Sequence, residues 1–281
     1  MSYEQRVDRT HPGCILFLID QSASMSEVMA GGSQSPKSEA LCDAVNGLLY
    51  ELVLRCIKDP SDGPRHYYDV GVIGYGATVG PALGGALAGQ SLVSIAEIGN
   101  HPLRVEDRNK VDADRPTRRV KFPVWFDPKA ENGTPMSSAI DMAGSLVGPW
   151  VAVHPDSFPP IVINISDGAA TDGDPRVWAE RLKSLSTTDG NALLFNVNLS
   201  ALGSDALFFP SSPSALTDDY ARTLFEMSSA LPSFMQDLAS QQGLAVSDGA
   251  RGFVFNADIL AVIAFLQIGT ATHHILGERT V

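Results

Sequence analysis

The sequence predicts an α/β protein with a largely parallel central sheet that is covered by helices on both faces. Two observations predict this fold class. First, several apolar runs have the length of a strand but lack the alternation of a half-exposed strand, which is typical of strands buried on both faces. Second, segments with helical periodicity separate these runs along most of the chain. Such alternation favours parallel strands that are linked by helices.

The first part of the chain predicts a strand, a helix and a second strand. Residues 14–19, CILFLI, are all apolar and are followed by Asp20. Pro36 opens a helical pattern that extends to residue 57, because proline fits the first turn of a helix. Residues 67–76 predict the second buried strand, and the glycines of GYGATVG (74–80) predict a turn after it. The apolar stripe of the helix consists of Leu41, Val45, Leu48, Leu49, Leu52 and Cys56.

The region 78–132 has a mixed pattern, and we interpret it as an elaboration within a single domain that spans residues 1–281. Residues 91–98 and 118–126 are expected to be strands. Between them, residues 104–121 are densely charged and mostly basic. This segment predicts a solvated loop or the tip of a hairpin, and a basic docking patch on an acidic protein is the alternative.

The second half of the chain continues the alternation of strands and helices. Asp174 is expected to cap a helix that has Pro175 in its first turn. The expected strands are residues 159–168, 191–199 and 251–255, and the expected helices are residues 134–147, 174–185, 217–230, 233–243 and 256–272.

Composition excludes some classes of function. With 44% hydrophobic residues the chain can bury an ordinary core, and its net charge of −12 argues against a nucleic-acid partner. No apolar run reaches the roughly 18–20 residues that a membrane span needs. The three cysteines have no CxxC spacing, so we expect buried free thiols in a reducing compartment. The cytoplasm is therefore the expected location.

Oxygen-bearing side chains gather where predicted strands end. Asp20, Ser22 and Ser24 come at the end of the first strand, Asp167 is at the end of the run 159–168, and Thr134 opens a helix. In a parallel sheet, ligands bind at the carboxyl ends of the strands. An all-oxygen set suits Mg²⁺, Mn²⁺ or Ca²⁺. Two carboxylates and three hydroxyls would leave a position open for an external carboxylate. Ser26 and Asp172, which lie nearby, are expected to be turn or cap residues.

Three motifs together resemble the von Willebrand factor A (vWA) domain family. DQSAS (20–24) resembles its D-x-S-x-S motif, NGTPMSSAI (132–140) its threonine loop, and ISDGAATDGD (165–174) its second aspartate segment. The resemblance covers about residues 12–270. It implies a Rossmann-like three-layer domain with a metal-ion-dependent adhesion site (MIDAS).

In that family the residues equivalent to Ser22 and Ser24 bind the metal directly. The resemblance implies that Thr134 binds directly or through water, and that Asp20 and Asp167 act through water. An aspartate or glutamate of a protein partner often completes the coordination.

The resemblance further implies a cytoplasmic, non-enzymatic adaptor that binds Mg²⁺. Bacterial intracellular relatives include proteins associated with tellurium resistance and with kinases and phosphatases, and others work with AAA+ ATPases. We therefore expect a role in a stress-response or biological-conflict system, beside an ATPase, kinase or phosphatase. Two alternatives stay open, a metal-dependent phosphohydrolase and a pseudo-MIDAS adaptor that never binds metal.

Overall fold

The computed structural model describes residues 2–29, 35–59, 61–112, 115–199, 205–216 and 218–272. Its centre is a sheet with the strand order β3-β2-β1-β7-β8-β10-β9, and β4 pairs with β2. The five central strands are parallel, and only the short strands β3, β4 and β9 pair in the antiparallel sense. The parallel strands are β1 (Gly13–Asp20), β2 (Tyr68–Tyr75), β7 (Ile161–Ser166), β8 (Leu193–Leu199) and β10 (Phe253–Ala257), and the short strands are β3 (Val79–Pro81), β4 (Val93–Ser94) and β9 (Leu207–Phe208).

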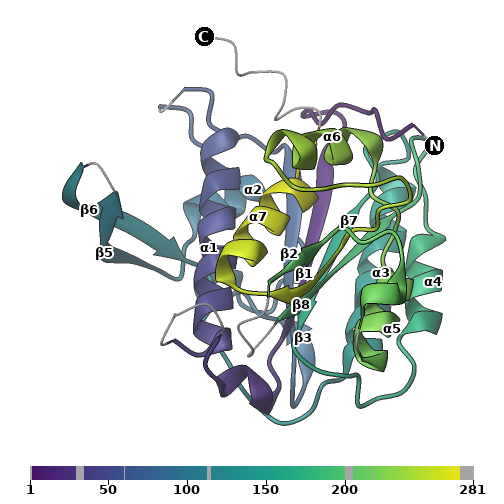
Figure 1. Cartoon of the computed structure of the whole chain (residues 1–281). Helices are drawn as coiled ribbons and strands as arrows, with labels where there is room; N and C mark the ends of the chain where they lie inside the picture. The colour runs from purple at the N-terminus through teal and green to yellow at the C-terminus, as the bar shows by residue number, and fades with distance from the viewer. Residues whose placement is uncertain are drawn as a thin grey trace.

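Helices cover both faces of this sheet (Figure 1). Helices α1, α2, α6 and α7 pack on one face, and α3, α4 and α5 pack on the other. The predicted three-layer α/β class is thereby confirmed. The helices are α1 (Lys37–Arg55), α2 (Ile95–Asn100), α3 (Met136–Val153), α4 (Arg176–Lys183), α5 (Asp219–Met227), α6 (Ser233–Gln241) and α7 (Ile259–Gly269), and the 3₁₀ turns are η1 (Ala23–Ser26), η2 (Gly85–Leu87) and η3 (Pro213–Ala215).

Strand β1 shows why its sequence has no polar alternation. Ile15, Phe17 and Ile19 belong to the core on the side of α1 and α7. Leu16 and Leu18 belong to the core on the side of α3. Every residue of β1 is buried, because the strand is paired on both edges and covered on both faces.

The prediction of a strand over residues 91–98 is wrong for most of its length. Only Val93 and Ser94 form a strand, and α2 follows immediately. The Ser94 hydroxyl accepts a hydrogen bond from the backbone N–H of Glu97 at 3.2 Å, so Ser94 caps the helix. Ile95 and Ile98 are both fully buried. Their spacing of three residues suits a helix face and not a strand face.

The other predicted strands and helices are present, with bounds that differ by a few residues. Helix α3 differs most, since it continues past residue 147 to Val153. Trp150 in this added turn is buried and its indole N–H donates to Asp69 Oδ2 at 2.9 Å. The short strands β3 and β9 are not predicted by the sequence. All three cysteines are buried free thiols, as expected.

The basic segment belongs to a two-stranded hairpin that projects from the body of the molecule (Figure 1). Strand β5 (Arg104–Asp112) pairs in antiparallel register with β6 (Arg115–Val124), from Arg104 opposite Val124 outward. The hairpin interpretation is therefore confirmed, although the sequence alone predicts no strand at β5. In the described part of the chain, no helix has both the length and the apolar character to cross a bilayer.

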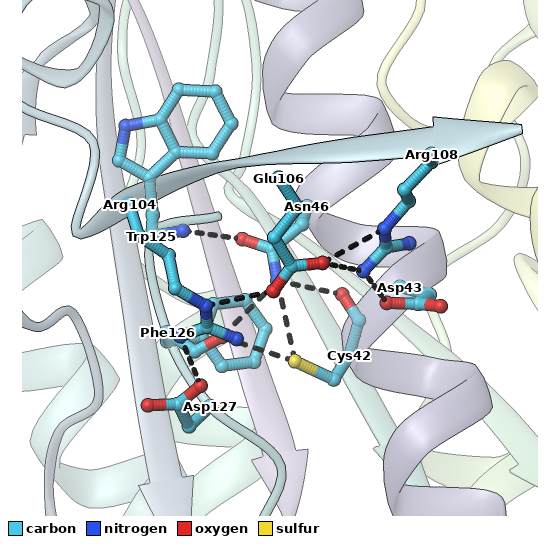
Figure 2. A network of polar contacts seen from close by, with 9 residues as sticks. All are labelled: Cys42, Asp43, Asn46, Arg104, Glu106, Arg108, Trp125, Phe126 and Asp127. Carbon is cyan, nitrogen blue, oxygen red and sulfur yellow. Dashed lines mark hydrogen bonds and ion pairs between the residues drawn. The ribbon is translucent and has the colours of Figure 1, made fainter. Parts of the chain in front are cut away.

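A network of polar contacts fixes the base of this hairpin to α1 (Figure 2). Asn46 is fully buried, and its Oδ1 accepts from the backbone N–H of Trp125 at 2.7 Å. Its Nδ2 donates to the Phe126 carbonyl at 3.2 Å, and the Cys42 thiol donates to the same carbonyl at 3.1 Å. Further out, Arg108 pairs with Asp43 at 2.9 Å. The buried amide of Asn46 thus forms hydrogen bonds with the backbone that follows β6, at the base of the hairpin.

Candidate metal centre

Asp20 lies at the carboxyl end of β1, beside the end of the neighbouring strand β7. Its Oδ2 accepts from the Ser166 hydroxyl at 2.5 Å, and its Oδ1 accepts from the backbone N–H of Ser22 at 2.8 Å. Asp20 is only 1% exposed. Burial raises the pKa of Asp20 to about 6, although these hydrogen bonds act to lower it. The parallel register of β1 and β7 brings these side chains together.

Ser22 and Ser24 present their hydroxyls to one another. The two Oγ atoms are 3.0 Å apart, and Ser24 Oγ donates to Asp167 Oδ1 at 2.7 Å. Ser22 is in the N-cap position of η1, yet its side chain makes no capping hydrogen bond. A turn-forming serine would ordinarily bond to the backbone of that turn. The structure therefore joins Asp20, Ser22, Ser24 and Asp167 in one hydrogen-bonded cluster.

The Thr134 loop adjoins this cluster through its backbone. The N–H of Glu131 donates to the Gln21 carbonyl at 2.6 Å, which places the loop beside the DQSAS turn. Thr134 accepts from the Thr171 N–H at 3.0 Å, and its own N–H donates to Thr171 Oγ1 at 3.0 Å. Gly133 has a φ of +86°, which favours glycine. Hydrogen bonds to Gln21, which follows β1, and to Thr171, which follows β7, thus hold the Thr134 loop in place.

Two of the nearby polar residues have the structural roles predicted for them. Asp172 accepts from the backbone N–H groups of Ser137 and Ser138 at 3.0 and 2.8 Å, so it satisfies the first turn of α3. The Ser26 hydroxyl donates to the Ala23 carbonyl at 2.7 Å. Neither side chain joins the Asp20 cluster through these bonds.

The structure adds a residue that the sequence did not point to. Lys37 is only 3% exposed, and its Nζ donates to Asp167 Oδ2 at 2.8 Å and to Glu27 Oε2 at 2.9 Å. Burial by itself lowers the pKa of Lys37, but the bonds to Asp167 and Glu27 outweigh it and raise the pKa. The ammonium is therefore charged. Its position as the first residue of α1 was the available signal, since a cation is disfavoured in the first turn of a helix.

The buried hydroxyl of Tyr220 lies near Ser166 and near the charges of Asp20 and Asp167. Tyr220 Oη makes no hydrogen bond among the residues that the structure describes. Burial raises the pKa of Tyr220 well above its usual value, and the charges of Asp20 and Asp167 raise it further. An unpaired polar atom in such a place is costly unless water or a ligand satisfies it.

The residues fit a hard divalent cation. In an octahedral Mg²⁺ site with bonds of 2.0–2.1 Å, adjacent oxygens are about 2.9 Å apart, and the two serine oxygens are 3.0 Å apart. Ser24 directs its proton to Asp167, so the oxygen of its hydroxyl can present a lone pair to a metal. Within the described ranges no group of three or more His, Cys, Asp or Glu could hold a metal ion. Hydroxyls would therefore have to supply much of the coordination.

Comparisons with known proteins assign no family or function to this chain. No family model matches the chain, and no curated protein matches it. Among solved structures, proximal thread matrix protein 1 from the mussel byssus, with a zinc-occupied MIDAS motif, is 13% identical with a TM-score of 0.47. That match covers 95% of this chain and 48% of the other. A second crystal form of the same protein gives 14% identity and a TM-score of 0.45 over 94% of this chain and 48% of the other.

An archaeal protein gives a weaker match. The ArnB paralog VWA2 from Sulfolobus acidocaldarius is 14% identical with a TM-score of 0.33, over 67% of this chain and 35% of the other. This chain spans less than half the length of these structures. Identities and TM-scores this low say nothing of what the chain binds, so its function is inferred from its own side chains.

Proposed function

We propose that this chain is a metal-dependent protein-interaction module of the vWA type. It binds Mg²⁺ or Mn²⁺ at the cluster formed by Asp20, Ser22, Ser24 and Asp167. The observation that supports it most is the pair of serine hydroxyls 3.0 Å apart, one of them donating to Asp167. This spacing matches adjacent ligands of an octahedral ion. It is not explained by a turn, because Ser22 does not cap η1.

In this proposal each residue has a separate task. Ser22 and Ser24 hold the metal by their hydroxyl oxygens, and Thr134 binds it directly or through water. Asp20 and Asp167 orient bound water, since both lie within the same hydrogen-bonded cluster. When bound, the metal supplies an electrophilic position that a carboxylate of a protein partner can take. The partner is thus proposed to provide an aspartate or a glutamate.

We propose that the module is not an enzyme. A phosphohydrolase needs a general base near the metal. Both oxygens of Asp20 accept hydrogen bonds, from Ser22 and Ser166. Both oxygens of Asp167 accept them too, from Ser24 and Lys37. Glu27 is bound to the Lys37 ammonium. Each of these carboxylates is thus already a hydrogen-bond acceptor within the cluster, so none of them is proposed as a general base.

The wider role is proposed from the resemblance of the three motifs. We propose a cytoplasmic adaptor of the bacterial intracellular type, acting beside an AAA+ ATPase, kinase or phosphatase in a stress-response or conflict system. Neither nucleic acid nor membrane is proposed as a partner, in keeping with the net charge of −12.

Calorimetric titration of Mg²⁺ and Mn²⁺ into chelator-treated protein tests the metal site. We expect saturable binding to the wild type and at least a tenfold loss in Ser22→Ala, because one of two direct ligands is removed. Ser26→Ala is the matched control, since Ser26 belongs to the same turn and its hydroxyl donates to the Ala23 carbonyl. A loss in Ser26→Ala equal to that in Ser22→Ala would contradict the assignment.

Selection from a random peptide library then tests the partner chemistry. Panning on the wild type in Mg²⁺ should enrich peptides with an aspartate or glutamate that is essential for binding. The same peptides should be lost with chelator and with Ser22→Ala, and retained with Ser26→Ala. Enrichment of peptides that bind equally well in chelator would contradict recognition through the metal.

A further inference from the structure

The Lys37 ammonium lies beside Asp167, one of the two carboxylates of the proposed metal site. Lysine is almost never fully buried unless it is paired, and Lys37 is 3% exposed with two carboxylate partners. One of them, Asp167, is also the acceptor for Ser24. A single carboxylate therefore separates the ammonium from a proposed direct ligand of the metal.

Two features of the local structure disfavour a positive charge at Lys37. Lys37 is the first residue of α1, where the helix dipole disfavours positive charge. Burial also disfavours the charged form. The buried ammonium is stable because Asp167 and Glu27 accept hydrogen bonds from Lys37 Nζ at 2.8 and 2.9 Å. The ammonium thus neutralises one of the carboxylates that a divalent ion would need.

We infer that Lys37 is a tethered cation that competes with the divalent metal for Asp167 and so sets the metal affinity of the site. This inference rests on the proposed metal-binding function. A divalent ion at the serine pair and the ammonium repel each other at close range. Metal binding is therefore coupled to withdrawal of the ammonium from Asp167.

Glu27 provides a place for the withdrawn ammonium. The Glu27 side chain is 60% exposed, while Asp167 is 1% exposed at its side chain. The two carboxylates bind the same ammonium from the solvent side and from the buried side. Lys37 can therefore leave Asp167 and keep an ion pair with Glu27. The site has two arrangements, with either Lys37 or the metal next to Asp167.

Calorimetric titration of Mn²⁺ into Lys37→Met tests this competition. Methionine keeps most of the length of the side chain and removes the charge. We expect the variant to bind Mn²⁺ at least tenfold more tightly than the wild type. Lys183→Met is the control, because Lys183 pairs with Glu180 on α4 at 2.7 Å. The Mn²⁺ affinity of this variant should equal that of the wild type.

Chemical labelling gives a second readout that needs no variant. In the metal-free wild type, Lys37 should resist acetylation by a water-soluble reagent, as followed by mass spectrometry. Addition of Mn²⁺ should raise the rate at Lys37 at least fivefold, and chelator should reverse this. If Lys37→Met does not fold, the labelling decides. Unchanged reactivity in a wild type that binds Mn²⁺ would overturn the inference.

The outcomes separate this inference from the proposed function. Equal or weaker Mn²⁺ binding in Lys37→Met, with binding in the wild type, overturns the competition and leaves the metal module standing. Binding in Lys37→Met alone supports the competition and shows that the wild-type site is blocked. Absence of binding in both proteins overturns both proposals.

Discussion

Asp20 shows how one buried carboxyl group makes the metal-free fold depend on pH. Burial raises the pKa of Asp20 from 3.8 to about 6, so the folded state holds the proton more tightly than the unfolded state. Stability from this group is full below about pH 4, falls as the pH rises to about 6, and is absent above that. The difference is on the order of 3 kcal/mol. Metal or a nearby cation would offset this cost at neutral pH.

Asp20→Asn should remove this component of the pH dependence. The amide can still accept from the Ser22 N–H and can donate to Ser166, whose hydroxyl is also 3.0 Å from the Gly168 carbonyl. We expect the variant to gain stability relative to the wild type by up to about 3 kcal/mol between pH 4 and 7. Urea denaturation in chelator measures it. Parallel stability curves for the two proteins would contradict a raised pKa.

At the scale of elements, a buried amide on α1 anchors the base of the hairpin. The Asn46 side chain accepts a hydrogen bond from the Trp125 N–H and donates one to the Phe126 carbonyl. We expect Asn46→Ala to destabilise the protein by about 2–3 kcal/mol, because a buried backbone donor loses its partner. Urea denaturation measures the loss, and limited proteolysis should show earlier cleavage at the hairpin.

The ion pair beside it offers a matched comparison. Asp43 is one turn away on α1 and pairs with Arg108 at 2.9 Å, but it is largely exposed. Asp43→Asn should cost less than about 1 kcal/mol, because solvent screens exposed pairs. A larger loss in Asp43→Asn than in Asn46→Ala would show that charge, and not the buried amide, holds the hairpin.

At the scale of the whole molecule, the sheet decides where the site lies. Strands β1 and β7 are parallel neighbours, so the polar residues that follow them meet at the same edge. Gly76 follows β2 and passes close to this edge. A Cβ on Gly76 would lie 2.7 Å from the Gln21 carbonyl, which explains one glycine of the GYG sequence. The hairpin, in contrast, projects away from the body (Figure 1).

A shortened hairpin should therefore leave the site intact. Arg108 and Val120 are paired, so residues 109–119 can be replaced by Asn-Gly. We expect the melting temperature to change little and the Mn²⁺ affinity to stay within twofold, since the anchoring residues remain. Calorimetry and thermal denaturation measure both. A tenfold change in Mn²⁺ affinity would make the hairpin part of the metal site.

The sequence by itself determined the fold class and most elements, because continuous apolar runs such as residues 14–19 have few structures open to them other than a strand buried on both faces. The prediction from sequence is wrong at residues 91–98, whose apolar content favours a strand, because Ser94 accepts from the Glu97 N–H and caps a helix there. The motifs also pointed to Asp20, Ser22, Ser24 and Asp167, which the structure joins by hydrogen bonds.

Only the tertiary structure decided that a lysine shares this cluster. Lys37 is 130 residues from Asp167 in the chain, and no local pattern pairs them. The burial of its ammonium depends on where α1 begins relative to the end of β7. Contacts of this kind arise from the packing of whole elements, and sequence periodicity reports only which face of each element is buried.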